Sequence, residues 1–154
     1  MELESTWDEF FQLSISPRLY SGALELIRAH QAAGRSVYIV SNSVEFIVKR
    51  VASLVDADGY RCTRLDVRDD RYTGEIRGEH MYGLEKAAAI HLLAADTGIR
   101  EANIWCYADH GSDADILQLV GHPFPTNPNQ TLLSIARRHD WQVVHFNPRQ
   151  TAKL

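Results

Sequence analysis

Short β-branched runs alternate with longer segments of helical periodicity along this chain, and that alternation is the strongest constraint on its fold. Residues 36–40 form a compact apolar run that is typical of a buried strand. A second such run lies at residues 103–108, and amphipathic segments at 43–55 and 112–120 follow the two runs. Strands that alternate with helices indicate an α/β fold with a doubly wound parallel sheet of Rossmann type.

The remaining segments fit smaller elements of the same architecture. We expect helices at 5–14, 19–33, 83–95 and 128–138, a hairpin of 60–67 and 72–76, a proline-interrupted edge strand at 122–126 and a last strand at 142–146. The hairpin is either a remnant of substrate-side structure or a plain extension of the sheet, and we favour the second interpretation. We predict a core at residues 19–147, preceded by an N-terminal helical segment at 1–18 and followed by a polar tail at 148–154.

Composition and charge exclude several function classes. The 154 residues include 16 Lys and Arg against 20 Asp and Glu, so the formal net charge is −4. A general nucleic-acid binder needs a concentrated basic face, so we expect no nucleic acid as a partner. No stretch approaches the ~18 apolar residues of a membrane helix, and no signal peptide is recognisable, so we expect no membrane partner and a cytoplasmic location. Cys62 and Cys106 are too few for a disulfide scaffold and are expected to be reduced.

Polar residues follow the first buried strand, at the edge where ligands of parallel sheets bind. Ser41-Asn42-Ser43 lies at the start of the next predicted helix. A hydroxyl beside the free N–H groups of a helix start can bind phosphate. The alternative is that Ser43 is an ordinary helix cap and Ser41 has no role, and for this tripeptide alone the alternative is the simpler interpretation.

Two carboxylates follow the second buried strand, and a lysine lies near the start of an earlier helix. Asp109 and Asp113 are four residues apart on a turn and can hold a hard cation such as Mg²⁺. Equally, Asp113 can be a first-turn acid favoured by the helix dipole, with Asp109 an exposed loop acid. A lysine near a helix start is unfavourable for the helix dipole, so a phosphate or carboxylate partner would explain the position of Lys86. The commoner alternative is a solvated lysine.

Taken together and in this order, these features resemble the haloacid dehalogenase-like (HAD) phosphohydrolases, and within them the branch related to phosphoserine phosphatase. Residues 37–43 match the family's second motif, a Ser or Thr that ends a hydrophobic strand. Residues 83–86 match the third motif, a lysine, and residues 107–113 match the fourth, an acidic pair after a strand. The resemblance extends from about Tyr20 to Phe146, and it implies that the helical segment at 1–18 is a remnant of the family's cap.

The resemblance implies a Mg²⁺-dependent phosphomonoesterase that acts on a phosphorylated small molecule. It implies that Ser41 and Asn42, together with Lys86, bind the phosphate, and that Lys86 neutralises charge on the phosphate and the nucleophile. It also implies that Asp109 and Asp113 form the metal site.

One family motif has no counterpart at the expected place. The family's first motif is an Asp-x-Asp at the end of its first strand, and its first Asp is the nucleophile. The only Asp before Ser41 is Asp8, which has no Asp two residues further on, so we identify no nucleophile. In the family that strand is central, between the strands matched by 36–40 and 103–108, so we predict a core without its central strand. A smaller departure is His110, where a Ser is usual.

Three hypotheses follow from this departure. The first is a truncated or split phosphatase, completed by an upstream segment or by a complementing chain at the gap in the sheet. The second is an inactive phosphate-binding pseudoenzyme, or a homo-oligomer whose sheet closes across chains. The third is a transition-metal site of Asp109, His110, Asp113 and His122, which we rank last because the spacing matches no standard zinc pattern.

Overall fold

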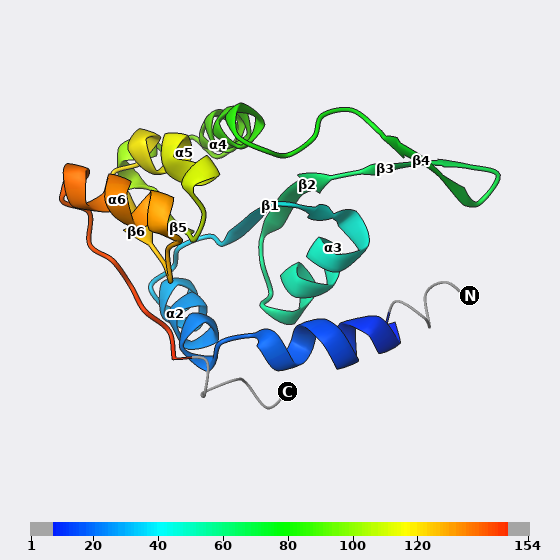
Figure 1. Ribbon diagram of the computed structural model, residues 1–154, viewed down its shortest axis with the longest axis horizontal. Helices are drawn as coiled ribbons and strands as arrows, with labels where there is room; N and C mark the ends of the chain where they lie inside the picture. Colours follow the sequence, from blue (N-terminus) through cyan, green and yellow to red (C-terminus); the bar gives the residue numbers. More distant parts are fainter. Residues whose placement is uncertain (1–7, 148–154) are drawn as a thin grey trace. The chain divides into compact units, whose positions relative to one another are not determined.

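The computed structural model describes residues 8–147, which form two compact units, residues 8–79 with 146–147 and residues 80–145 (Figure 1). Each unit contains a two-stranded parallel sheet and helices, which confirms the predicted α/β class. Among the described residues, no helix is both long enough and apolar enough to cross a membrane. The predicted tail at 148–154 and the first seven residues of the predicted N-terminal segment lie outside the described residues.

The first unit begins with irregular helix. From residue 8 the chain is helical, through a π-helical turn η1 (Phe11–Ile15) and a 3₁₀ turn η2 (Ser16–Arg18). The helical segment extends beyond residue 14, the predicted end of the first helix, because Pro17 lies in the first turn of η2, where its missing N–H is not needed. Helix α2 (Ser21–Ala32) follows and buries Leu24.

A β–α–β unit forms the centre of this first part. Strand β1 (Tyr38–Val44) pairs in parallel with β2 (Gly59–Thr63), and helix α3 (Glu45–Leu54) connects them and buries Val48 and Ala52. The strand is longer than predicted and the helix starts later, at Glu45. Val44 precedes the helix without a side-chain cap, so the interpretation of Ser43 as a helix cap is wrong.

The predicted hairpin is confirmed only in its outer part. Strand β3 (Leu65–Arg68) pairs antiparallel with β4 (Arg71–Ile76), but the residues before β3 belong to β2 and pair with β1. Asp69 and Asp70 have φ of +50° and +58°, the left-handed conformation that a two-residue hairpin turn of type I′ requires at both positions.

The second unit repeats the alternation of helix and strand. Helix α4 (Leu84–Thr97) and the 3₁₀ turn η3 (Glu101–Asn103) lead into β5 (Trp105–Ala108). The 3₁₀ turn η4 (Gly111–Asp113) and helix α5 (Ala114–Leu119) then lead into β6 (His122–Pro125), which pairs in parallel with β5. Helix α6 (Gln130–His139) ends the unit, with Asn129 as its N-terminal cap.

Of the two strands expected near the end of the chain, one is confirmed and one needs correction. The proline-interrupted edge strand expected at 122–126 is confirmed as β6, which is the parallel neighbour of β5 in a two-stranded sheet; its prolines occupy positions whose missing N–H the ladder tolerates. The predicted strand at 142–146 is wrong, since only one isolated bridge forms there, between Thr126 and Val144. Trp141 packs against the core around Leu117 and Leu132, as expected for a core aromatic residue.

The parallel sheets are narrow. Within residues 8–147, β1 has β2 as its strand neighbour and β5 has β6, and the described residues contain three two-stranded sheets. The absence of the family's central strand stays a prediction.

Candidate functional site

A buried ion pair lies at the end of β5. The Lys86 Nζ donates a hydrogen bond to the Asp113 Oδ1 at 2.8 Å, and the two side chains are only 10% and 7% exposed. Lys86 comes from the first turn of α4, and Asp113 is the last residue of η4. Burying either charge alone would be costly, so each side chain needs the other. The interpretation of Lys86 as a solvated lysine is therefore wrong, and its expected carboxylate partner is Asp113.

The electrostatic effect of this pair extends to β5. Burial, assisted by the nearby Asp113 carboxylate and opposed by Lys86, raises the pKa of the Cys106 thiol to about 12. Cys106 is therefore a neutral thiol at physiological pH and is excluded as a nucleophile. Both Cys106 and Cys62 are free of disulfide bonds, as predicted.

The loop that carries Asp113 is held by hydrogen bonds from its own residues. The backbone N–H of Ser112 donates to the His110 Nδ1 at 3.2 Å, and the backbone N–H of Asp113 donates to the His110 carbonyl at 2.9 Å. His110 thus caps η4 with its imidazole. The capping role explains why position 110 has a side chain with a hydrogen-bond acceptor.

The same loop is also anchored to α6. The Asp109 carbonyl accepts a hydrogen bond from the Asn129 N–H at 2.8 Å, while the Asp109 side chain is exposed. A Cβ on Gly111 would lie 2.6 Å from the Thr131 Cγ2, so this close approach requires glycine. Asp109 and Asp113 are therefore carried by a loop with fixed ends, although their exposures differ greatly.

Ser41 and Asn42 lie in the other unit. The Ser41 Oγ accepts a hydrogen bond from the Ser43 N–H at 3.1 Å, and the β1–β2 register shifts between Ser41 and Val44. Asn42 is exposed. The structure thus brings together Lys86 and Asp113 within one unit and places Ser41 and Asn42 in the other.

A family profile described as haloacid dehalogenase-like hydrolase matches residues 2–118. The chain belongs to this HAD-like family. It is 35% identical over 146 residues to a probable phosphatase of Mycobacterium tuberculosis, covering 95% of this chain and 50% of that protein. It is 28% identical over 154 residues to a phosphoserine phosphatase of the same organism, covering 99% and 50%. The chain thus spans about half the length of these curated relatives.

The solved structures include similar folds. A crystal structure of a protein of unknown function from Bordetella pertussis Tohama I superposes with a TM-score of 0.84 at 29% identity, over 93% of this chain and 66% of that one. This similarity and the family profile confirm the Rossmann-type α/β fold that the sequence predicts.

Within residues 8–147, no Asp-x-Asp tripeptide lies at the end of a strand, the position of the nucleophilic motif in the HAD-like family. Two Asp-x-Asp tripeptides have the right spacing: Asp56-Ala57-Asp58 precedes β2, and Asp113-Ala114-Asp115 runs from the end of η4 into the first turn of α5. The first of them has a different role. The Asp58 Oδ2 accepts a hydrogen bond from the Val37 N–H at 2.7 Å, and the Asp58 N–H donates to the Val37 carbonyl at 2.8 Å. This tripeptide therefore joins the beginnings of β1 and β2 and has a structural role.

A transition-metal site is not formed by the part of the chain that the structure describes. Residues 8–147 contain no group of three or more His, Cys, Asp or Glu side chains that could hold a metal ion. His122 stacks on Trp105 across β5 and β6, with ring centroids 3.9 Å apart. His110 serves as the cap of η4. The hypothesis of a histidine-containing metal site is therefore not supported.

Proposed function

We propose that this chain forms part of the active site of a Mg²⁺-dependent phosphomonoesterase that acts on a phosphorylated small molecule in the cytoplasm. The buried pair of Lys86 and Asp113, 2.8 Å apart, carries the proposal. Membership of the HAD-like hydrolase family supports it, as do relatives that are named phosphatases.

Lys86 is suited to neutralise the charge of a phosphoryl group. Its ammonium has three N–H donors, and one of them binds the Asp113 Oδ1. Asp113 thereby fixes the direction of the ammonium before any ligand arrives. A charge held in place in a buried site stabilises a developing charge better than a mobile surface lysine does. We assign charge stabilisation and phosphate binding to Lys86, and the orientation of Lys86 to Asp113.

Ser41 and Asn42 supply the remaining groups that we assign to phosphate. The Ser41 oxygen already accepts a hydrogen bond from the Ser43 N–H, so its own O–H remains as a donor. The exposed Asn42 side chain adds an amide donor. Neutral hydroxyl and amide donors of this kind bind phosphate oxygens.

The carboxylates fit Mg²⁺ by their chemistry. Mg²⁺ in proteins is usually held by one or two carboxylates, while water and substrate phosphate complete its shell. Asp109 is exposed and follows β5 directly, and Asp113 uses its Oδ1 for Lys86. We propose that Asp109 and Asp113 hold the ion; when bound, Mg²⁺ neutralises negative charge on the phosphate.

The nucleophile has to come from a segment with the family's first motif. Ahead of Ser41 the only Asp is Asp8, whose carboxylate contacts Arg50. We therefore propose that hydrolysis needs an aspartate from an upstream segment or a complementing chain. A phosphate-binding protein without turnover is the second candidate, and the same missing motif favours it.

A hydrolysis assay tests the proposal. Phosphate release from a panel of small phosphomonoesters is measured with the full chain, with Mg²⁺ or with EDTA, alone and with a peptide that carries Asp-x-Asp at a strand end. We expect turnover only with the peptide and Mg²⁺, and no turnover in Lys86→Gln, whereas the exposed-lysine control Lys49→Gln keeps it. Absence of turnover in every mixture, together with phosphate binding by the wild type, supports the second candidate. Absence of both contradicts the proposal.

A further inference from the structure

His110 has no part in the function proposed above, although it lies between Asp109 and the loop segment that carries Asp113. It is also the position at which this loop departs from the HAD-like family, where a Ser is usual. The side chain is exposed, so packing in a core does not account for a histidine here. The hydrogen bonds that its ring makes are therefore the place to look for its role.

These hydrogen bonds fix which ring nitrogen of His110 carries the proton. The Nδ1 accepts the Ser112 N–H at 3.2 Å, and the Ser112 Oγ lies 2.9 Å from the same nitrogen. A ring nitrogen that accepts from a backbone N–H carries no proton, so the proton of the neutral imidazole is on Nε2. The Nδ1 side of the ring is thus directed back at η4, and the Nε2 side has no part in this cap.

The placement of Asp113 depends on η4. Asp113 is the last residue of this turn, and its N–H donates to the His110 carbonyl at 2.9 Å. A three-residue 3₁₀ turn has few hydrogen bonds of its own, so a side-chain cap contributes much of what holds it. The Asp113 Oδ1 in turn accepts from the Lys86 Nζ at 2.8 Å. A shift of η4 would therefore move the buried carboxylate and redirect the ammonium that it orients.

The ends of the loop are held without the imidazole. The Asn129 N–H donates to the Asp109 carbonyl at 2.8 Å, and Gly111 lies closely against Thr131. A change of the His110 side chain leaves both of these anchors in place. Loss of the imidazole should therefore act on η4 without releasing the loop.

We propose that His110 is a positioning residue of the phosphate site: its Nδ1 holds η4, and η4 fixes the Asp113 carboxylate and the Lys86 ammonium. The inference rests on the proposed function, since it assigns a role within the same site. Groups that orient the ligands of a metal typically contribute roughly 10–100-fold to affinity or activity, so loss of the Nδ1 acceptor should weaken phosphate binding about tenfold or more.

Substitutions of His110 separate its two ring nitrogens. The Asn side chain places an acceptor oxygen near the position of Nδ1, the Gln amide reaches the position of Nε2, and Ala provides neither group. The affinity of the full chain for inorganic phosphate is measured by calorimetric titration with Mg²⁺ present, and urea unfolding shows that each variant is folded. We expect His110→Asn to bind as the wild type does, and His110→Gln and His110→Ala to bind about tenfold or more weakly.

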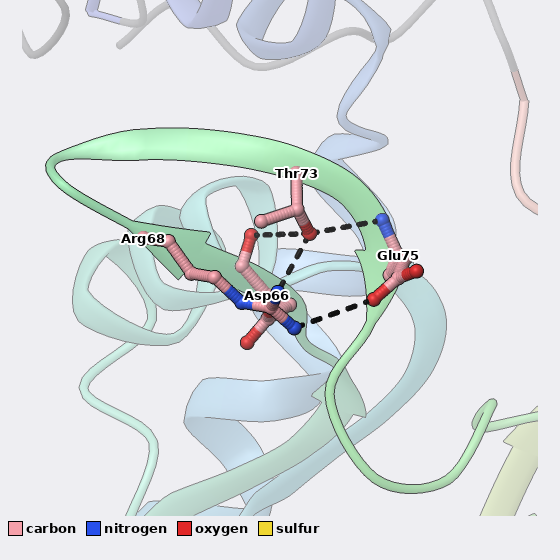
Figure 2. A network of polar contacts seen from close by, with 4 residues as sticks. All are labelled: Asp66, Arg68, Thr73 and Glu75. Atoms are coloured by element: carbon pink, nitrogen blue, oxygen red, sulfur yellow. Dashed lines mark hydrogen bonds and ion pairs between the residues drawn. The ribbon is translucent and has the colours of Figure 1, made fainter.

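Thr73 provides a matched control, because its hydroxyl also accepts from the N–H two residues further on. Figure 2 shows the Glu75 N–H donating to the Thr73 Oγ1, at the same 3.2 Å as in the His110 cap. Thr73 lies on the β3–β4 hairpin, which forms a two-stranded sheet of its own. Thr73→Val therefore removes a comparable hydrogen bond outside the proposed site and should leave phosphate affinity unchanged.

Equal phosphate affinities of the wild type, His110→Gln and His110→Ala overturn the inference and leave the proposed function standing. Binding that Gln restores and Asn does not also overturns it, because the ring would then act through Nε2. No binding by the wild type contradicts the proposed function instead, and with it the site that His110 is inferred to hold. Independently of any ligand, ¹⁵N NMR of the imidazole should find the proton on Nε2, and a proton on Nδ1 overturns the inference.

Discussion

Removal of Lys86 alone tests how strongly the buried Lys86–Asp113 pair contributes to the free energy of unfolding. In Lys86→Met the Asp113 carboxylate remains, 7% exposed and without its cation. Loss of one partner of a buried ion pair costs about 3–5 kcal/mol, because the other charge stays buried and uncompensated. Whole domains are stable by only about 5–15 kcal/mol, so this loss is a large share of the total.

The double variant separates pairing from packing. In Lys86→Met/Asp113→Asn no charge remains buried, so we expect it to be more stable than Lys86→Met alone, with a coupling energy of at least about 2 kcal/mol. Urea unfolding followed by tryptophan fluorescence is suitable, since Trp105 and Trp141 both lie in the second unit. The control Arg64→Met breaks an exposed pair with Glu45 and should cost less than about 1 kcal/mol. Additive single losses would refute the reasoning.

Three further predictions concern the second unit. The pKa of Cys106 is raised from 9.0 to about 12, so the folded state holds the thiol proton more tightly than the unfolded chain does. The free energy of unfolding is therefore highest below pH 9 and falls by up to about 4 kcal/mol as the pH rises from 9 to 12. Cys106→Ala should abolish that part of the pH dependence of urea unfolding. Gly121→Ala would place a Cβ 1.9 Å from the Ala102 carbonyl oxygen, so the thermal midpoint should fall sharply, and an unchanged midpoint would contradict the packing. The Asn129 side chain accepts from the Leu132 N–H at 2.9 Å, so Asn129→Ala should cost about 1 kcal/mol by urea unfolding, whereas Asn129→Ser should retain most of the stability.

Hydrophobic periodicity predicted most of the fold. The helices α2, α3, α4 and α6 and the strands β1 and β5 lie close to the predicted positions, because their apolar stripes are regular. The extension of β1 through Ser41 and Asn42 was not predictable in this way, since polar residues in a strand are held by ladder partners that are distant in sequence. Strand β6 was predicted despite its prolines, because an edge strand tolerates their missing N–H groups.

The candidate site was predicted in part. The unfavourable place of Lys86 at a helix start indicated an anionic partner, and the structure provides Asp113 from a segment 27 residues away. Sequence did not distinguish Asp113 as a partner of Lys86 from Asp113 as an ordinary first-turn acid, because that distinction depends on tertiary packing. The cap formed by His110 was also missed, since histidine is not a usual capping residue.

Calorimetric titration of the full chain with inorganic phosphate in the presence of Mg²⁺ tests the central claim most directly. The account predicts a binding heat for the wild type and its loss in Lys86→Gln/Asp113→Asn, which removes both charges of the buried pair. The control Lys49→Gln, which removes an exposed charge on α3, should bind as the wild type does. Equal heats for the wild type and the double variant, or no heat for the wild type, would contradict the account.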